Sequence, residues 1–221
     1  MSDSTTATTP TPDFDTHPVR GRFNAAFFGL IAPYLEWHLR QHKQRTFTQL
    51  PREVVELGSG VGANLRFLPD GATLIAIEPN PYMHHRLRTA AERAGVHLEL
   101  RLRPGEDTGL ADNSVDAVIS SLVLCTVDDP ARVLAEVRRV LRPGGTFHFV
   151  EHVAAPADTP TRTVQRVLRR PWAWVFEGCS CERDLERVVR AAGFSRVVID
   201  RYRLRTPFLP FNPHIAGIAT A

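Results

Sequence analysis

Three glycines at alternate positions follow directly on a run of β-branched residues in the stretch VVELGSGVGANL, residues 54–65. Glycine in the interior of an ordinary strand or helix costs stability, so such a cluster marks a tight turn or a ligand pressed against the backbone. Gly58, Gly60 and Gly62 therefore predict a bend at the end of a buried strand, where a bound molecule approaches the main chain.

Short β-rich runs alternate with helical patterns along the chain after Pro51. The expected strands cover residues 54–57, 73–77, 97–101, 115–120, 146–150, 196–202 and 214–220. The expected helices begin at residue 63 or cover residues 82–94, 131–141, 161–170 and 182–192, with LRPGG, residues 141–145, as a helix stop and turn. This alternation implies crossover connections. It predicts an α/β fold, a Rossmann-like seven-stranded, mostly parallel sheet with helices on both faces.

The length of 221 residues, with 43% hydrophobic and 23% charged residues, fits one domain. Residues 1–18 are rich in Ser, Thr, Pro and Asp and predict a flexible tail. Residues 19–50 carry apolar side chains at helical spacing around Pro33, which predicts one or two amphipathic helices acting as a lid. Within the single domain 19–221 we expect a ligand-binding core over 51–155, and further helices and closing strands over 156–221.

Composition excludes several functional classes. The formal net charge of +3 is spread along the chain, which argues against a nucleic-acid partner. No apolar run reaches the roughly 18 to 20 residues of a membrane span, and no secretion signal opens the sequence. The 3 cysteines are too few for a disulfide framework. We therefore expect a cytoplasmic protein without a membrane span, and the oligomeric state stays open.

Two acidic residues beside the glycines narrow the ligand class. Glu56 precedes the loop, and Glu78 ends the next expected strand, 20 positions after Gly58, where it can hydrogen-bond a ribose diol. The segment GSGVGA also satisfies the dinucleotide pattern G-x-G-x-x-A. A carboxylate at Glu56 would repel a pyrophosphate but suits a ligand that carries an ammonium or sulfonium group. The residues thus favour S-adenosylmethionine over a nicotinamide dinucleotide.

At these positions the chain resembles the class I S-adenosylmethionine-dependent methyltransferases, whose first motif has the form E-x-G-x-G-x-G. The resemblance extends from about residue 51 to the C-terminus and includes EPNPYM, GEDTGLADNSVDAVIS and VLAEVRRVLRPGGTFHFVEH. It implies that Glu78 holds the ribose. It further implies that the first motif contacts the cofactor through Glu56, Gly58, Ser59, Gly60, Gly62 and Asn64. The residues expected near the adenine are Pro79, Asn80, Met83, Gly105, Glu106 and Asp107. Ser120 and Leu122 are expected near the methionine part of the cofactor.

A narrower resemblance connects SLVLCTV, EHVAA, FEGC and NPHIAGIA to the vertebrate thiol S-methyltransferases of the methyltransferase-like group. Those enzymes methylate alkyl thiols and carry an apolar N-terminal membrane anchor, a feature that we do not find in this sequence. The resemblance implies methyl transfer to a small apolar acceptor, foremost a thiol sulfur. Two alternatives stay open: an O- or N-methyltransferase of a quinone, phospholipid or specialised metabolite, and a cofactor-binding module without catalysis.

Acceptor-side candidates follow from position and residue type. His152 comes directly after the fifth expected strand and is the candidate general base or orienting group, the alternative being a histidine that only packs. Aromatic residues outside the crossover units form either an apolar lid over the acceptor or plain core, with Cys179 as pocket lining; they are Phe23, Phe27, Trp172 and Trp174. Cys179 and Cys181 form a C-x-C pair, yet a closed zinc site needs four ligands and no second pair accompanies them, so no metal is expected.

Overall fold

The computed structural model describes residues 18–176 and 178–221. The expected tail therefore lies outside the described residues, apart from Pro18, which begins the first helix. Seven strands form one sheet in the order β3-β2-β1-β4-β5-β7-β6, which confirms the predicted fold class. The strands are β1 (Glu53–Leu57), β2 (Thr73–Ile77), β3 (His97–Arg101), β4 (Val115–Ser121), β5 (Leu141–His152), β6 (Arg196–Arg203) and β7 (Pro213–Thr220).

Strands β1 to β5 are parallel, and β7 runs antiparallel to both β5 and β6. The strand order reverses between β1 and β4, where Leu57 pairs with Ser120 on one side and with Ile77 on the other. In open parallel sheets, ligands bind at the carboxyl ends of the strands next to such a reversal. The topology therefore assigns the carboxyl ends of β1, β2 and β4 to a ligand.

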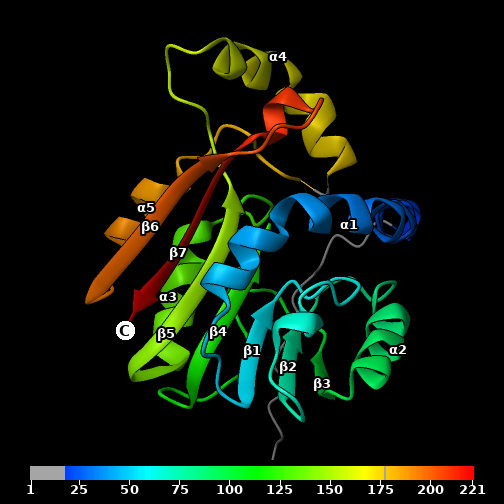
Figure 1. The fold of residues 1–221 in the computed structure, drawn as a ribbon, viewed down its shortest axis with the longest axis vertical. Coiled ribbons are helices and arrows are strands. Elements are labelled where there is room, and N and C mark those ends of the chain that lie inside the picture. The colour runs from blue at the N-terminus through cyan, green and yellow to red at the C-terminus, as the bar shows by residue number, and fades with distance from the viewer. Residues whose placement is uncertain (1–17, 177) are drawn as a thin grey trace, which may run out of the picture.

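In the part of the chain that the structure describes, five α-helices and two short 3₁₀ helices surround the sheet: α1 (Pro18–Thr46), α2 (His84–Ala94), α3 (Pro130–Val140), α4 (Pro160–Val175), α5 (Leu185–Ala191), η1 (Leu65–Phe67) and η2 (Leu209–Phe211). Figure 1 shows α1 crossing above the arrowheads of β1 and β2, with α4 beyond it. Neighbouring residues of β5 contact different layers, because the His148 ring bonds to the Thr46 carbonyl of α1, whereas the Phe147 ring stacks on Phe194 after α5. Helices thus cover both faces.

The prediction of a helix that begins at Ala63 is wrong. Residues 61–64 form turns, and only Leu65–Phe67 are helical, as the 3₁₀ helix η1. Gly62 holds a φ of +87°, and the side chain of Asn64 donates to Glu56 instead of pointing to solvent. Pro69 follows closely and disfavours a longer helix, because the residue before a proline avoids helical backbone angles. The short connection keeps the glycine loop close to the sheet.

Two other boundaries differ from the sequence expectation. The segment LRPGG does not form a separate turn, since α3 ends at Val140 and β5 begins at Leu141 with a register shift opposite Val115–Ala117. An irregularity in the pairing takes up residues 142–145, with Gly144 at a φ of +81°. Helix α4 continues past Pro171 to Val175, so this proline sits inside the helix.

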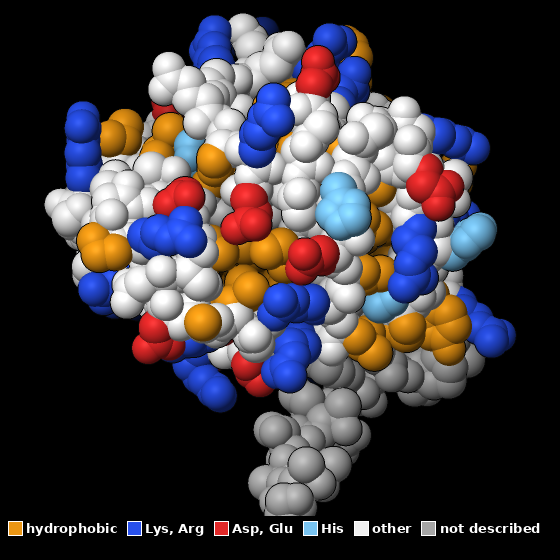
Figure 2. Space-filling view, turned by 90° about the horizontal axis from the view of Figure 1, so that it is seen from below, with side chains coloured by type: hydrophobic (Ala, Val, Ile, Leu, Met, Phe, Trp, Pro, Cys, Tyr) orange, Lys and Arg blue, Asp and Glu red, His pale blue; other side chains and the backbone are white. Residues whose placement is uncertain are grey.

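Charged side chains are mixed in sign on the surface. Figure 2 views the molecule from below and shows basic and acidic side chains interspersed, with apolar side chains between them. Among the described residues, no helix combines the length and the apolar character required to cross a membrane. The main apolar core lies between the sheet and its helices and includes Leu39 of α1, Phe149 of β5 and Leu185 of α5.

His148 fastens α1 to the sheet and gives the fold a pH dependence. Its Nδ1 lies 2.6 Å from the Thr46 carbonyl oxygen, and burial lowers its pKa. As the pH falls, His148 is therefore protonated in the unfolded chain before it is protonated in the folded one. Its contribution to the free energy of unfolding is complete above about pH 6.5 and is lost as the pH falls below that value. In urea titrations from pH 7.5 to 5, we expect His148→Gln to show a shallower fall of unfolding free energy than the wild type.

The exposed His97 of β3 supplies the matched control. His97→Gln should keep the wild-type pH slope, because His97 lies on the edge strand β3, away from the contact between His148 and Thr46. Equal slopes for His148→Gln and the wild type would contradict this assignment.

Candidate functional site

The glycine loop after β1 has a geometry that other residues do not fit. Gly58, Gly60 and Gly62 have φ values of +57°, +54° and +87°, in the left-handed region. A Cβ on Gly58 would lie 2.5 Å from Cγ2 of Val123, and one on Gly62 would lie 2.6 Å from Cδ1 of Leu65. Gly60 differs, because its Cβ would meet no protein atom closer than the Met83 sulfur at 3.6 Å. The protein itself therefore leaves room at Gly60.

Glu78 ties the glycine loop to the loop after β2. Its Oε2 accepts a hydrogen bond from the Gly60 amide at 2.7 Å, and its Oε1 accepts one from the Asn80 amide at 2.8 Å. The carboxylate is 4% exposed. Hydrogen bonds from backbone N–H groups to a carboxylate are charge-assisted and among the stronger ones in proteins. Glu78 thus fixes the edge at which the sequence analysis expected a ribose.

Glu56 is a buried carboxylate whose hydrogen bonding is incomplete. Its Oε1 accepts a 2.6 Å hydrogen bond from Asn64 Nδ2, while its Oε2 and the Asn64 Oδ1 have no protein partner. Burial raises the pKa of Glu56, and the bond from Asn64 and the charge of Lys43 oppose that effect. A buried acceptor without a partner is costly, so this pair of oxygens suits a ligand that brings N–H donors or positive charge.

Helix α1 closes over this loop with a buried cation. Lys43, the sole lysine of the chain, is 2% exposed and forms an ion pair with Glu36, about two helical turns earlier on the same face of α1. Its burial lowers the lysine pKa, which the charges of Glu36 and Glu56 counteract. A cleft of about 460 Å³ separates α1 from the glycine loop; it is lined by Gly29, Ala32, Pro33, Glu36, Trp37, Arg40, Val61, Gly62, Ala63 and Arg66. The expected helical lid thus contacts the site.

The other residues expected around the cofactor lie in two groups. Ser59, Asn80 and Met83 are buried beside the loops after β1 and β2, and Pro79 is half-buried between them. The loop after β3 brings Gly105 and Glu106 to the same end of the sheet as half-buried residues. Asp107 faces outward instead, because its carboxylate is 52% exposed and accepts a hydrogen bond from Arg103.

Glu151 connects the ends of β4 and β5. Its Oε1 accepts hydrogen bonds from Ser120 Oγ at 2.7 Å and from the Val123 amide at 3.1 Å, and its Oε2 has no protein partner. Burial raises its pKa to about 7. Leu122 lies between these contacts at a φ of +61°, a conformation rare for a residue with a side chain. This buried carboxyl, not assigned a role from the sequence, fixes the loop that touches Gly58.

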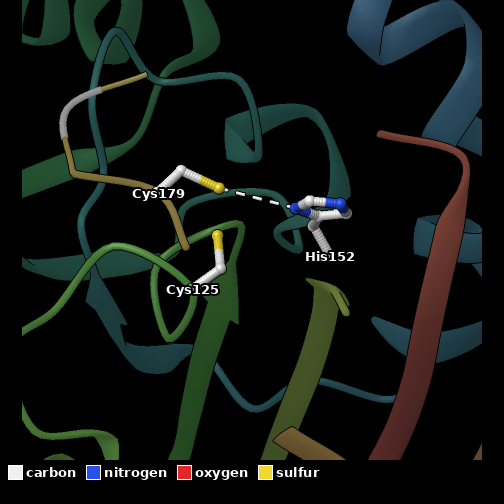
Figure 3. A group of neighbouring side chains, drawn as sticks. All are labelled: Cys125, His152 and Cys179. Atoms are coloured by element: carbon white, nitrogen blue, oxygen red, sulfur yellow. Dashed lines mark hydrogen bonds between the residues drawn. The ribbon is translucent and has the colours of Figure 1, made fainter. Parts of the chain in front are cut away.

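His152 ends β5 in full burial, with both ring nitrogens engaged. Its Nε2 lies 2.6 Å from the Pro210 carbonyl oxygen, which can only accept, so Nε2 carries a proton and in the neutral ring the lone pair is on Nδ1. Nδ1 faces Cys179 Sγ at 3.5 Å, and Cys125 lies alongside, as Figure 3 shows. Cys179 therefore occupies the nitrogen that a general base would use, so the sequence hypothesis of His152 as a direct base gains no support from this geometry.

Aromatic rings form a continuous path from α1 to His152. Phe23 stacks on Phe27 at 5.8 Å, Phe27 meets Phe176 at 5.5 Å, and Phe176 stacks on Trp172 at 4.1 Å, which itself lies 6.0 Å from the His152 ring. Trp174, at 63% exposure, meets the outer end of this path at Phe23. The structure thus places Trp172 and Cys179 beside His152, and Phe23 and Trp174 at the rim.

Similarity to known proteins identifies the family of this chain. Residues 55–149 match the family described as methyltransferase domain. Human thiol S-methyltransferase TMT1B is 40% identical over 169 residues, which cover 75% of this chain and 69% of that protein. Human thiol S-methyltransferase TMT1A is 38% identical over the same shares of both chains. The chain belongs to the thiol S-methyltransferase family.

The fold agrees with this assignment. A solved SAM-dependent methyltransferase from Thermotoga maritima, named as a possible histamine N-methyltransferase, superposes with a TM-score of 0.64 at 18% identity, covering 91% of this chain and 99% of that one. The enzyme is thus an S-adenosylmethionine-dependent methyltransferase, as the sequence predicted. The incomplete hydrogen bonding of Glu56 and Asn64 and the open space at Gly60 fit a nucleoside that carries a sulfonium and an ammonium group.

Three residues of the site carry weak sequence signals. Lys43 was visible as the sole lysine, and Glu151 as the residue before His152, but neither has a spacing that reveals burial. Cys125 lies 27 positions before His152 and 54 before Cys179, and only the folded sheet brings the three together.

Gly60 gives a direct test of the cofactor site. In Gly60→Ala the new methyl has room in the protein but fills the space beside the loop, so we expect S-adenosylhomocysteine affinity to fall at least about tenfold, roughly 1.4 kcal/mol. Isothermal titration calorimetry measures this change.

Gly71 provides the matched control, because it has a φ of +65° with no atom within 4 Å of its would-be Cβ. Both alanines should lower the unfolding free energy by about 1–2 kcal/mol, the cost of left-handed backbone with a side chain. Gly71→Ala should bind the nucleoside as the wild type does, and equal binding by both variants would contradict the placement.

Proposed function

We propose that this enzyme transfers the methyl group of S-adenosylmethionine to the sulfur of a small apolar thiol. The observation that carries the proposal is the 40% identity to human thiol S-methyltransferase TMT1B over most of both chains. The apolar ring path that ends at His152 and Cys179 supports it from the structure.

The cofactor-holding residues follow from the geometry. Glu78 would bond the ribose hydroxyls from its position at the end of β2, while Glu56 and Asn64 present unpartnered oxygens to the positively charged end. S-adenosylmethionine, when bound, supplies an electrophilic methyl group on a sulfonium. Because Glu56 is buried, its charge is little screened by solvent and favours the cationic donor over its neutral product.

The protein's main task is to align two groups and exclude water. Methyl transfer is an in-line displacement, so a nucleophile held in near-attack geometry gains most of its advantage from orientation. A thiol is partly ionised near neutral pH and is intrinsically nucleophilic. A thiol acceptor therefore needs less help from a base than an alcohol does.

The rings above His152 favour an apolar acceptor. Trp172 is 8% exposed, and its ring stacks on Phe176 and approaches Phe211 at 6.4 Å. Contact with such rings favours a ligand with apolar surface by roughly 25 cal/mol per Å² removed from water. We accordingly propose alkyl and aryl thiols without charge as the substrate class.

A matched panel tests the acceptor. The purified enzyme is given S-adenosylmethionine with a thiol, an alcohol and a primary amine that share one alkyl chain, and S-adenosylhomocysteine is quantified. We expect turnover of the thiol and none above background for the alcohol. Turnover confined to the amine or the alcohol would contradict the thiol assignment and favour an O- or N-methyltransferase.

Trp172 and Trp174 test whether the buried rings contact the acceptor, because they lie two positions apart on α4 and only Trp172 is buried. We expect Trp172→Phe to raise KM for a long-chain alkyl thiol about tenfold relative to a short-chain one, a loss of about 1.4 kcal/mol in apolar contact. Trp174→Phe should leave that ratio unchanged. Retained S-adenosylhomocysteine binding confirms that each variant is folded. Equal ratios of long-chain to short-chain KM in Trp172→Phe and the wild type would contradict a contact between Trp172 and the alkyl chain.

A further inference from the structure

Cys125, His152 and Cys179 form a cluster of soft ligand atoms outside the two cofactor loops that Glu78 connects. They follow β4, end β5 and lie in the loop between α4 and α5, and all three are buried. One ligand atom from each lies within 4.8 Å of the other two, and Figure 3 shows the two sulfurs and the imidazole converging. Among the described residues, this is the one group of at least three such side chains that meets this geometry.

The spacing suits a tetrahedral metal ion. Zinc binds cysteine sulfur at about 2.3 Å and histidine nitrogen at about 2.0–2.1 Å, which separates neighbouring ligand atoms by roughly 3.5–3.8 Å. Cys179 Sγ and His152 Nδ1 are 3.5 Å apart. The remaining separations, up to 4.8 Å, need only a small rotation of the cysteine side chains.

The surroundings of His152 are those of a metal ligand. Metal-bound histidines commonly donate their second ring N–H to a backbone carbonyl, which fixes the ring and the tautomer. Here the Nε2 of His152 lies 2.6 Å from the Pro210 carbonyl oxygen, and Gln165 Nε2 donates to the same oxygen at 3.0 Å. In the neutral ring, Nδ1 therefore has a free lone pair, and it faces the two sulfurs (Figure 3).

Charge balance favours a divalent ion in this place. Two thiolates and a neutral imidazole carry a charge of −2, which a divalent cation cancels, so the site that holds its ion but no acceptor is neutral in an apolar surrounding. Soft sulfur and imidazole ligands select zinc-like ions over magnesium or calcium. The sequence expectation of no metal depended on pairing Cys179 with Cys181, whereas Cys181 points away and donates to the Gln165 carbonyl at 3.3 Å.

We propose that Cys125, His152 and Cys179 bind one thiophilic divalent ion, Zn²⁺, with a fourth coordination position left for an acceptor thiolate. The second half of this assignment rests on the proposed function. A ligated Nδ1 has no lone pair to offer a substrate, so the assignment replaces the base role that the sequence suggested for His152. Catalytic zinc sites likewise use three protein ligands and one exchangeable position.

The cluster lies next to the cofactor loop. Cys125 is two residues after Val123, whose Cγ2 lies 2.5 Å from the Cβ position of Gly58. On coordination, the acceptor thiol would lose its proton to solvent. Its sulfur lone pair then forms the bond to the methyl carbon, while the carbon–sulfonium bond breaks and its electron pair stays on S-adenosylhomocysteine sulfur.

Cobalt is the probe that tests the site, since Co²⁺ bound by thiolates shows sulfur-to-metal charge-transfer absorption. The full chain is reduced with a phosphine, titrated with Co²⁺ and then with Zn²⁺. We expect charge-transfer absorption that saturates at about one ion per chain and disappears as Zn²⁺ displaces Co²⁺. Absence of that absorption in the wild type would overturn the proposal without reference to any variant.

Variants then assign the ligands. Cys125→Ser and Cys179→Ser should each lose the charge-transfer absorption, while the control Cys181→Ser, equally buried, should keep it. Equal loss in Cys181→Ser, or retention in both other variants, would overturn the ligand set. Cobalt binding by an enzyme that methylates no thiol would refute the proposed function and leave the metal site standing, so the two failures are distinguishable.

Discussion

The hydrogen bonds from two backbone amides to the buried Glu78 carboxylate are the interaction on which the site depends. They connect the loop after β1, through Gly60, to the loop after β2, through Asn80. Without them, the three left-handed glycines at positions 58, 60 and 62 would have no fixed conformation, because glycine is the residue with the most conformational freedom to lose. The parallel register brings Leu57 and Ile77 level, which places both loops at one edge.

The buried charges around this edge determine which nucleoside fits. Glu56 keeps an unpartnered oxygen beneath the loop, and Lys43 of α1 lies close enough to lower its pKa against the effect of burial. A pyrophosphate there would meet a carboxylate, whereas a sulfonium with an ammonium group meets a complementary charge. The same edge of the sheet continues to Glu151 and His152. The residues that face the methyl donor and those that face the methyl acceptor therefore lie at the carboxyl ends of neighbouring strands.

Local patterns predicted what depends on local physics. The seven strands and the tight bend at Gly58 follow from β-branched runs and turn chemistry. The helix expected from Ala63 failed because Asn64 is drawn back to Glu56. The meeting of Cys125 with Cys179 was invisible, since it depends on how the α4–α5 connection returns over β4, a long-range packing outcome without a sequence period.

Calorimetry of Glu56→Gln with S-adenosylmethionine tests the central claim most directly. Glutamine keeps the shape and an acceptor for Asn64 but removes the charge. The account predicts stoichiometric binding by the wild type, a loss of at least about tenfold in the variant and no uptake of a nicotinamide dinucleotide by either. Equal affinity of both proteins for the sulfonium nucleoside, or tighter binding of the dinucleotide, would contradict it.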